Sequence, residues 1–194
     1  MSQRLINSYL AEIDRLKKFS GTSTEQVIRE AFKDLLKNWS KANDLIFIPE
    51  LLYQTSLKTK VYPDGTVLHD VRVPVGYWEA KDTDDNIDQE IENKQRKGYP
   101  QDNIIYENSD IAVLIQNRQE VLRCSMTDTD ALDQLLTLFF AYERQEIAEF
   151  RRAVEQFKVD LPAVLAALRE KIDEAYTSNT AFKKAAKRFL DHAK

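Results

Sequence analysis

The first forty residues carry apolar side chains at the spacing of two amphipathic helices. Ser20-Gly21 interrupts the first, and a second helix is expected from about residue 25 to residue 39, after the capping-box sequence Thr22-Ser23-Thr24-Glu25. The apolar positions of the two helices are Leu5, Ile6, Tyr9, Ile13 and Leu16, and then Ile28, Phe32, Leu35, Leu36 and Trp39.

Between residues 45 and 125 the pattern changes to short β-like runs with one helix among them. Tyr62-Pro63-Asp64-Gly65 predicts a turn, because proline fixes φ and glycine accepts a positive φ. The embedded helix is expected from about 84 to 97, where Gly98 ends it and Pro100 prevents its continuation. The expected strands cover 56–62, 66–75, 77–81, 104–106, 111–115 and 121–124.

From residue 127 onward the pattern is helical again. Apolar positions between Leu132 and Phe157 predict one long helix, Asp160-Leu161-Pro162 restarts a second, and Thr177-Ser178-Asn179 leads into a third. We therefore expect an α/β fold, in which residues 1–126 form a mixed β-sheet flanked by helices. Residues 127–194 are expected to form a C-terminal helical extension.

Composition narrows the class of protein. The 194 residues are 43% hydrophobic and 31% charged, which is typical of a globular domain. No apolar run reaches the roughly 20 residues that a membrane-spanning helix needs, and the N-terminus does not resemble a secretory signal. A single cysteine excludes an internal disulfide and a cysteine-based zinc site. We expect a cytoplasmic protein with no membrane partner.

The net charge of −4 argues against binding nucleic acid by bulk electrostatics alone. It does not exclude a nuclease, because divalent metal ions supply positive charge where the phosphate binds.

Two carboxylates and a lysine form the candidate site. Glu79 and Lys81 point to the same face of a strand, and Asp70 lies on the preceding run, where adjacent strands would bring it beside Glu79. Such a set suits phosphodiester hydrolysis: the acids hold Mg²⁺, and the lysine orients or deprotonates a water or offsets negative charge. On spacing alone, an ordinary ion pair on an exposed strand accounts for Glu79 and Lys81 equally well.

Two further residues carry weaker signals. Glu25 lies on the side of its helix that holds Ile28 and Phe32, where an acid needs a partner, but the capping box explains it without any function. Lys94 shares the face of Ile87 and could extend toward the acids. An ordinary amphipathic lysine is the simpler interpretation.

Three sequence blocks resemble a known nuclease family. They are Gly76-Tyr77-Trp78-Glu79-Ala80-Lys81-Asp82, Lys94-xx-Lys97-Gly98-Tyr99-Pro100-xx-Asn103 and Ala112-Val113-Leu114-Ile115-Gln116-Asn117. Over residues 20–125 the chain is similar to the Mrr-like nuclease domain at the N-terminus of single-chain, type ISP-like restriction–modification enzymes. That domain belongs to the PD-(D/E)xK superfamily. The resemblance implies a restriction-endonuclease-like fold and a DNA endonuclease that depends on Mg²⁺, for which Mn²⁺ can substitute.

The resemblance also implies roles for individual residues. Asp70, Glu79 and Ala80 would form the metal site, Lys81 would be the catalytic lysine, and Glu25 would match a glutamate that the superfamily often adds from its first core helix. One departure is that the superfamily's Pro-Asp pair is replaced here by His69-Asp70.

Motifs of partner domains are missing from the sequence. It contains neither the Gly-xxxx-Gly-Lys-Ser/Thr loop of ATP-driven motors nor an Asn-Pro-Pro-Tyr-like methyltransferase motif. The resemblance implies that a methyltransferase, an ATP-driven translocase or both complete the same polypeptide, and that residues 127–194 begin a coupler to them. Two alternatives stay open: a catalytically silent nuclease-fold module that binds DNA or protein, and a helical scaffold supported only by residues 127–192.

Overall fold

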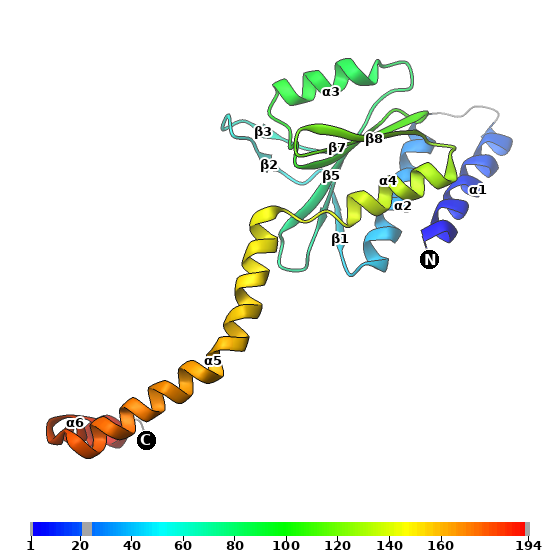
Figure 1. Cartoon of the computed structure of the whole chain (residues 1–194). Helices are drawn as coiled ribbons and strands as arrows, with labels where there is room; N and C mark the ends of the chain where they lie inside the picture. Colours follow the sequence, from blue (N-terminus) through cyan, green and yellow to red (C-terminus); the bar gives the residue numbers. More distant parts are fainter. Residues whose placement is uncertain (1, 21–24, 193–194) are drawn as a thin grey trace. The chain divides into compact units, whose positions relative to one another are not determined.

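The computed structural model describes residues 2–20 and 25–192 (Figure 1). The helices are α1 (Ser2–Ser20), α2 (Glu25–Ala42), α3 (Ile87–Arg96), α4 (Thr129–Phe140), α5 (Gln145–Ser178) and α6 (Thr180–His192). The strands are β1 (Ile46–Pro49), β2 (Tyr53–Gln54), β3 (Lys60–Val61), β4 (Gly65–Leu68), β5 (Pro74–Ala80), β6 (Asn103–Glu107), β7 (Ile111–Gln116) and β8 (Gln119–Ser125). The predicted capping residues Thr22, Ser23 and Thr24 lie outside this description.

In the described part of the chain, six strands form one mixed sheet in the order β1-β4-β5-β6-β7-β8. Neighbouring strands are antiparallel except β5 and β6, which are parallel and are joined through α3. A parallel pair needs such a crossover, because a tight turn cannot return the chain to the same end of the sheet. The predicted mixed sheet flanked by helices is confirmed.

Helices cover both faces of this sheet (Figure 1). The larger core joins α1, α2 and α4 to one face and includes Phe32 and Trp78. The smaller core lies under α3 and includes Tyr77, whose ring is 5.4 Å from that of Tyr53 on the small β2–β3 ribbon. Since side chains alternate along β5, Glu79 lies on the same face as Tyr77, the face that α3 covers.

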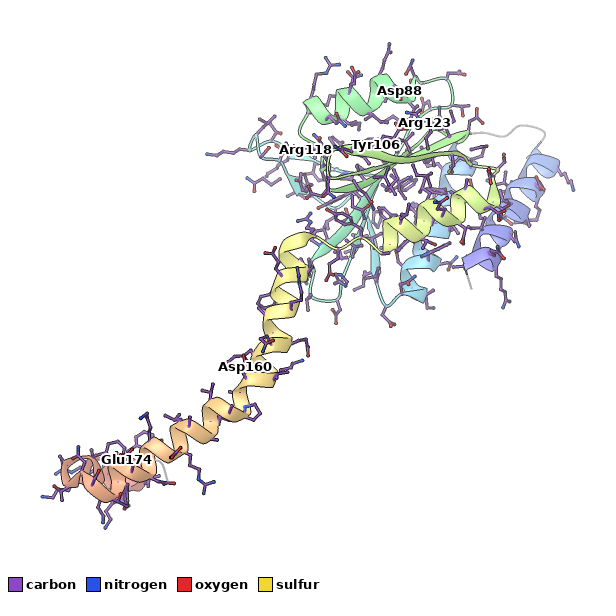
Figure 2. The ribbon with its side chains drawn as sticks, viewed as in Figure 1. Asp88, Tyr106, Arg118, Arg123, Asp160 and Glu174 are labelled. Atoms are coloured by element: carbon purple, nitrogen blue, oxygen red, sulfur yellow. The ribbon has the colours of Figure 1, made fainter. Side chains whose placement is uncertain are left out.

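Short-range and long-range contacts hold α3 over the sheet. Asn86 caps the helix by accepting hydrogen bonds from the backbone N–H groups of Asp88 and Gln89. Arg123 of β8 forms an ion pair with Asp88 on the first turn of α3 (Figure 2). Ile87 and Ile91 are buried beneath the helix. The helix is therefore fixed near its beginning and along its inner face.

The structure places α4 differently from the sequence prediction. Residues 127–157 were expected to form one helix within the extension, but α4 ends at Phe140 and belongs to the unit Met1–Arg144. Leu132, Leu136 and Phe139 of α4 are fully buried in the larger core. The predicted boundary at residue 126 is therefore wrong, and the second unit is Gln145–Lys194.

Side-chain amides from the sheet explain why α4 stops. Asn103 Nδ2 donates to the carbonyl oxygens of Phe139 (2.8 Å) and Val75 (2.9 Å), and Gln116 Nε2 donates to that of Leu138 (3.1 Å). These bonds satisfy helix-end carbonyls that a longer helix would use internally. Gly76 completes the packing: a Cβ there would lie 2.5 Å from the Phe139 ring and 2.6 Å from Asn103 Nδ2.

The second unit consists of α5 and α6. The predicted restart at Asp160-Leu161-Pro162 is wrong, because α5 runs through Pro162 as a single helix of 34 residues. A proline removes one helical hydrogen bond, and the remaining bonds on either side continue the helix. Asn179 caps α6 by accepting from the N–H groups of Ala181 and Phe182, both at 3.0 Å. None of the helices in the described residues combines the length and apolar character needed to cross a bilayer.

The different surroundings of two phenylalanines test the position of α4. Phe139 is fully buried, whereas Phe157 of α5 is 61% exposed. We expect Phe139→Ala to lower the free energy of unfolding by about 3–5 kcal/mol, because it leaves a cavity in the core. Phe157→Ala should change it by less than about 0.5 kcal/mol. Urea denaturation of both variants measures the difference, and equal effects would contradict the assignment of α4 to the core.

Candidate active site

Glu79 and Lys81 form a buried ion pair at the end of β5. Lys81 Nζ is 3.1 Å from Glu79 Oε1, and the Glu79 side chain is only 4% exposed. Lys81 Nζ also lies 3.6 Å from Oε2 of Glu90 on α3. The two residues thus share the predicted face, but the pair is not on an exposed strand, so the simple surface ion pair does not describe it.

Lys94 of α3 joins the same carboxylate. Its Nζ donates to Glu79 Oε1 and to the hydroxyl of Tyr99, which is 3.1 Å away. The ammonium also lies 4.3 Å from the centre of the Tyr99 ring. Burial lowers the pKa of Lys94, but the bonds to Glu79 and Tyr99 outweigh burial, so its pKa is raised overall. Lys94 therefore reaches Glu79, a contact that the simpler interpretation of it as an ordinary amphipathic lysine did not predict.

The second oxygen of Glu79 is also buried, and no hydrogen-bond partner for it is present among the described residues. The hydroxyl of Tyr106, which pairs with Glu79 in the register of β5 and β6, is likewise buried without a hydrogen-bond partner among the described residues. A buried carboxylate oxygen without a donor is costly, and a cation relieves that cost.

Asp70 does not lie beside Glu79. It follows β4 by two residues, and Leu68 at the end of β4 pairs with Pro74 at the beginning of β5. Glu79 is five residues farther along β5, about 16 Å at 3.3 Å per residue. Asp70 is exposed, and its Oδ1 accepts a hydrogen bond from the N–H of Val71. The expectation that adjacent strands bring Asp70 to Glu79 is wrong, because the antiparallel register separates them.

The same register brings Asp64 to the site. Gly65 pairs with Trp78, so Asp64 stands opposite Glu79 at the point where β4 begins and β5 ends. Asp64 Oδ2 accepts a hydrogen bond from the N–H of Ala80 at 2.9 Å. Its other oxygen accepts from Arg29 of α2. Ala80 thus lies between Glu79 and Lys81 in the sequence and contacts Asp64 in space.

Sequence reasoning missed Asp64, although a signal was present. Pro63-Asp64 is itself a Pro-Asp pair, and the same four residues that predict a turn contain it. Because a turn accounted for Pro63-Asp64, the Pro-Asp position of the nuclease motif was assigned to His69-Asp70 instead. The register of an antiparallel pair distinguishes Asp64 from Asp70. An acid just before β4 stands opposite the end of β5, whereas an acid just after β4 stands near the beginning of β5.

For the predicted site residue Glu25, the structure describes the backbone but not the side chain. Glu25 is the first residue of α2. Arg29 and Lys33 follow at intervals of four residues, and both line a cavity of about 400 Å³ that also contacts Asp64. Residues four apart share one side of a helix. Position 25 is therefore on the side of α2 that leads to Asp64.

The donor set fits a magnesium ion. No group of three or more acidic, histidine or cysteine side chains arranged for a metal occurs among the described residues. Mg²⁺ does not require one, because it usually keeps several waters and binds through one or two carboxylates. Asp64 and Glu79 would supply carboxylate oxygens from paired strands, and the unpartnered Oε2 of Glu79 offers a lone pair.

A further acid, Glu107, is buried behind Asp64. It ends β6, where its carbonyl accepts the N–H of Lys81 at 2.7 Å and its Oε2 accepts the N–H of Ser109 at 2.7 Å. Its Oε1 is buried with no partner in the described residues. Burial raises the pKa of Glu107 to about 7, against the smaller opposing effect of the Ser109 bond. No feature of the sequence singled out this residue.

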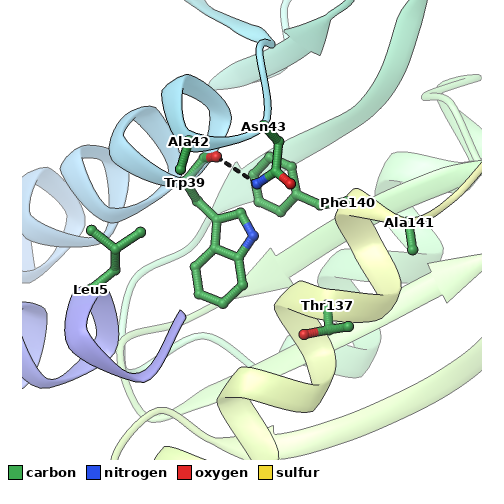
Figure 3. A pocket seen from close by; sticks show the side chains of 7 residues that line it. All are labelled: Leu5, Trp39, Ala42, Asn43, Thr137, Phe140 and Ala141. Atoms are coloured by element: carbon green, nitrogen blue, oxygen red, sulfur yellow. Dashed lines mark hydrogen bonds between the residues drawn. The ribbon is translucent and has the colours of Figure 1, made fainter. Parts of the chain in front are cut away.

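Another cavity lacks the chemistry of a catalytic site. It measures about 390 Å³ and lies between α1, α2 and α4, beside the stacked rings of Trp39 and Phe140 (Figure 3). Its polar side chains are Asn43, which donates to the carbonyl of Trp39, and Thr137. It contains no titratable side chain, so the end of β5 is the better candidate site.

Comparison with solved structures identifies the fold. The chain matches part of a chain in the cryo-EM structure of a DrdV–DNA complex, with 40% sequence identity and a TM-score of 0.80. The fold is restriction-endonuclease-like. The match covers 91% of the present chain, which includes part of residues 145–194, but only 17% of the DrdV chain.

A second structure is less similar. A putative nuclease belonging to DUF820 from Anabaena variabilis ATCC 29413 has a TM-score of 0.38 and 12% identity, over 54% of this chain and 80% of that chain. No protein-family model matches the chain, and no curated protein sequence does.

The buried acid makes a prediction about pH. Between pH 4.5, the ordinary pKa of a glutamic acid, and pH 7, folded Glu107 holds a proton that the unfolded chain has lost. The free energy of unfolding should therefore fall as the pH rises through this window, by about 3 kcal/mol, and level off above it. Glu107→Gln, which mimics the neutral acid, should remove this contribution.

Urea denaturation at pH 5 and pH 8 measures it as the difference between wild type and variant. The variant should be the more stable protein at pH 8. Parallel pH profiles for the two proteins would contradict a raised pKa at Glu107.

Proposed function

We propose that the chain is a Mg²⁺-dependent DNA endonuclease domain that hydrolyses phosphodiester bonds. The observation that carries the proposal is the end of the β4–β5 pair, where Asp64 stands opposite Glu79 and Lys81 contacts Glu79. The 40% identity to a chain that was solved in complex with DNA supports DNA as the substrate.

In this proposal the carboxylates of Asp64 and Glu79, with the backbone of Ala80 between them, hold Mg²⁺ or Mn²⁺. The bound metal supplies a Lewis acid for the phosphate and lowers the pKa of a water. Lys81 orients that water or offsets negative charge on the phosphate, since its ammonium is held against a metal ligand. Arg29 and Lys33 line the adjoining cavity and are placed to bind a phosphate. Glu25 remains a predicted contributor from α2.

We also infer that the domain is the cleavage module of a larger restriction–modification enzyme of the Mrr-like, type ISP-like kind. The three sequence blocks support this, and so does a match that spans only 17% of the DrdV chain. A methyltransferase, an ATP-driven translocase or both would belong to the same polypeptide. The second unit would begin the coupler to them, since its apolar side chains Phe157, Leu168 and Phe189 are more than half exposed.

Nicking of supercoiled plasmid with Mg²⁺ or Mn²⁺ tests the proposal. We expect metal-dependent nicking by the wild-type chain, and a loss of at least about a hundredfold in Asp64→Asn, Glu79→Gln and Lys81→Met, because each removes a group that acts in the transition state. Asp70→Asn should retain nicking, because Asp70 lies at the other end of the strand pair.

Each contrary outcome has a distinct meaning. Loss of nicking in Asp70→Asn but not in Asp64→Asn would restore the assignment based on sequence alone. Equal nicking by all the proteins would contradict this active site. Absence of nicking by a wild-type chain that binds duplex DNA would favour the catalytically silent module.

A further inference from the structure

Glu79 carries two ammonium groups on a single oxygen. Lys81 and Lys94 both donate to Oε1, and Oε2 has no partner among the described residues. Lys81 belongs to the motif itself, two residues along the same strand. Lys94 comes from a different element, α3, and no feature of strand geometry requires it there. Its contact with the predicted metal ligand therefore needs its own explanation.

Charge decides what this contact does. A carboxylate that is 4% exposed is poorly solvated, so it needs compensating positive charge to remain ionised. Lys81 and Lys94 together supply that charge. A divalent cation bound to Oε2 would supply it as well, and would repel an ammonium held on Oε1 of the same carboxylate. Metal and Lys94 therefore compete for Glu79.

Tyr99 is a second partner of the same ammonium. Its hydroxyl is already 3.1 Å from Lys94 Nζ, and its ring lies below the ammonium at 4.3 Å. A cation over an aromatic face keeps a favourable interaction when it loses its anion. Lys94 can thus move off Glu79 without becoming an isolated buried charge, and it stays at the edge of the candidate site.

We propose that Lys94 is a positioning residue that neutralises Glu79 until a divalent cation displaces its ammonium, which then stays with Tyr99. This rests on the proposed function, because Glu79 must be a metal ligand. The Lys94 contact would therefore lower the affinity of the site for a divalent metal ion in the absence of DNA.

Calorimetric titration of the full chain with Mn²⁺, in the absence of DNA, tests the proposal. Lys94→Met should bind Mn²⁺ at least tenfold more tightly than wild type, which corresponds to about 1.4 kcal/mol. Lys94→Gln provides a second variant that keeps a polar side chain, and it should also tighten binding. Damage to the fold would weaken binding, so a gain of affinity cannot come from damage. Thermal melting establishes that each variant is folded.

Lys97→Met is the matched control. It removes the same charge three residues farther along, at the exposed C-cap of α3, and should leave Mn²⁺ affinity unchanged. Unchanged or weaker affinity in both Lys94 variants would overturn the proposal. Mn²⁺ binding that persists unaltered in Glu79→Gln and Asp64→Asn would instead overturn the metal site of the proposed function.

The Mg²⁺ dependence of plasmid nicking gives an independent readout. Lys94→Met should reach its half-maximal rate at a lower Mg²⁺ concentration than wild type, because its Glu79 no longer holds a competing ammonium. A half-maximal Mg²⁺ concentration equal to or above that of wild type would overturn the competition.

Discussion

The backbone pairing of β4 with β5 is the interaction on which the candidate site depends. Gly65 opposite Trp78 and Leu68 opposite Pro74 determine which residue stands beside Glu79. A strand pair can slip only in whole residues, and each step exchanges its faces. The side chain of Asp64 strengthens this register, because its carboxylate accepts a hydrogen bond from the N–H of Ala80 just beyond the last paired residues of the two strands. One carboxylate thus contributes both to the sheet and to the chemistry.

Burial of Glu79 then determines what surrounds it. The Glu79 side chain lies between its own strand, β5, and α3, where water cannot solvate the carboxylate. Basic side chains from both elements therefore contact it. The Asn86 cap, the Arg123–Asp88 ion pair and the buried isoleucines hold α3 where Lys94 can reach. Asp64 is compensated from the other side of the sheet by Arg29. Each acid therefore draws its counter-charge from a different helix.

The sequence predicted those features that depend on local pattern. Periodicity located α1, α2 and α3, and strand alternation placed Glu79 and Lys81 on one face. It failed where distant residues decide the outcome. Asn103 and Gln116 end α4, although neither is near it in sequence. Asp64 was assigned to a turn, because the residues that favour turns also include the acid of the motif. Glu107 has an ordinary sequence context, and only the folded chain shows that it is buried.

The contact at Gly76 has a consequence for how this protein can change over evolutionary time. The Phe139 ring and the Asn103 amide already fill the volume that a side chain at position 76 would need. A larger residue at 76 becomes acceptable only together with a smaller one at 139, and a smaller residue at 139 alone leaves a void. Either single step produces a less stable intermediate. Positions 76 and 139 should therefore covary among homologous sequences, which links the strand that carries Glu79 to a helix on the opposite face.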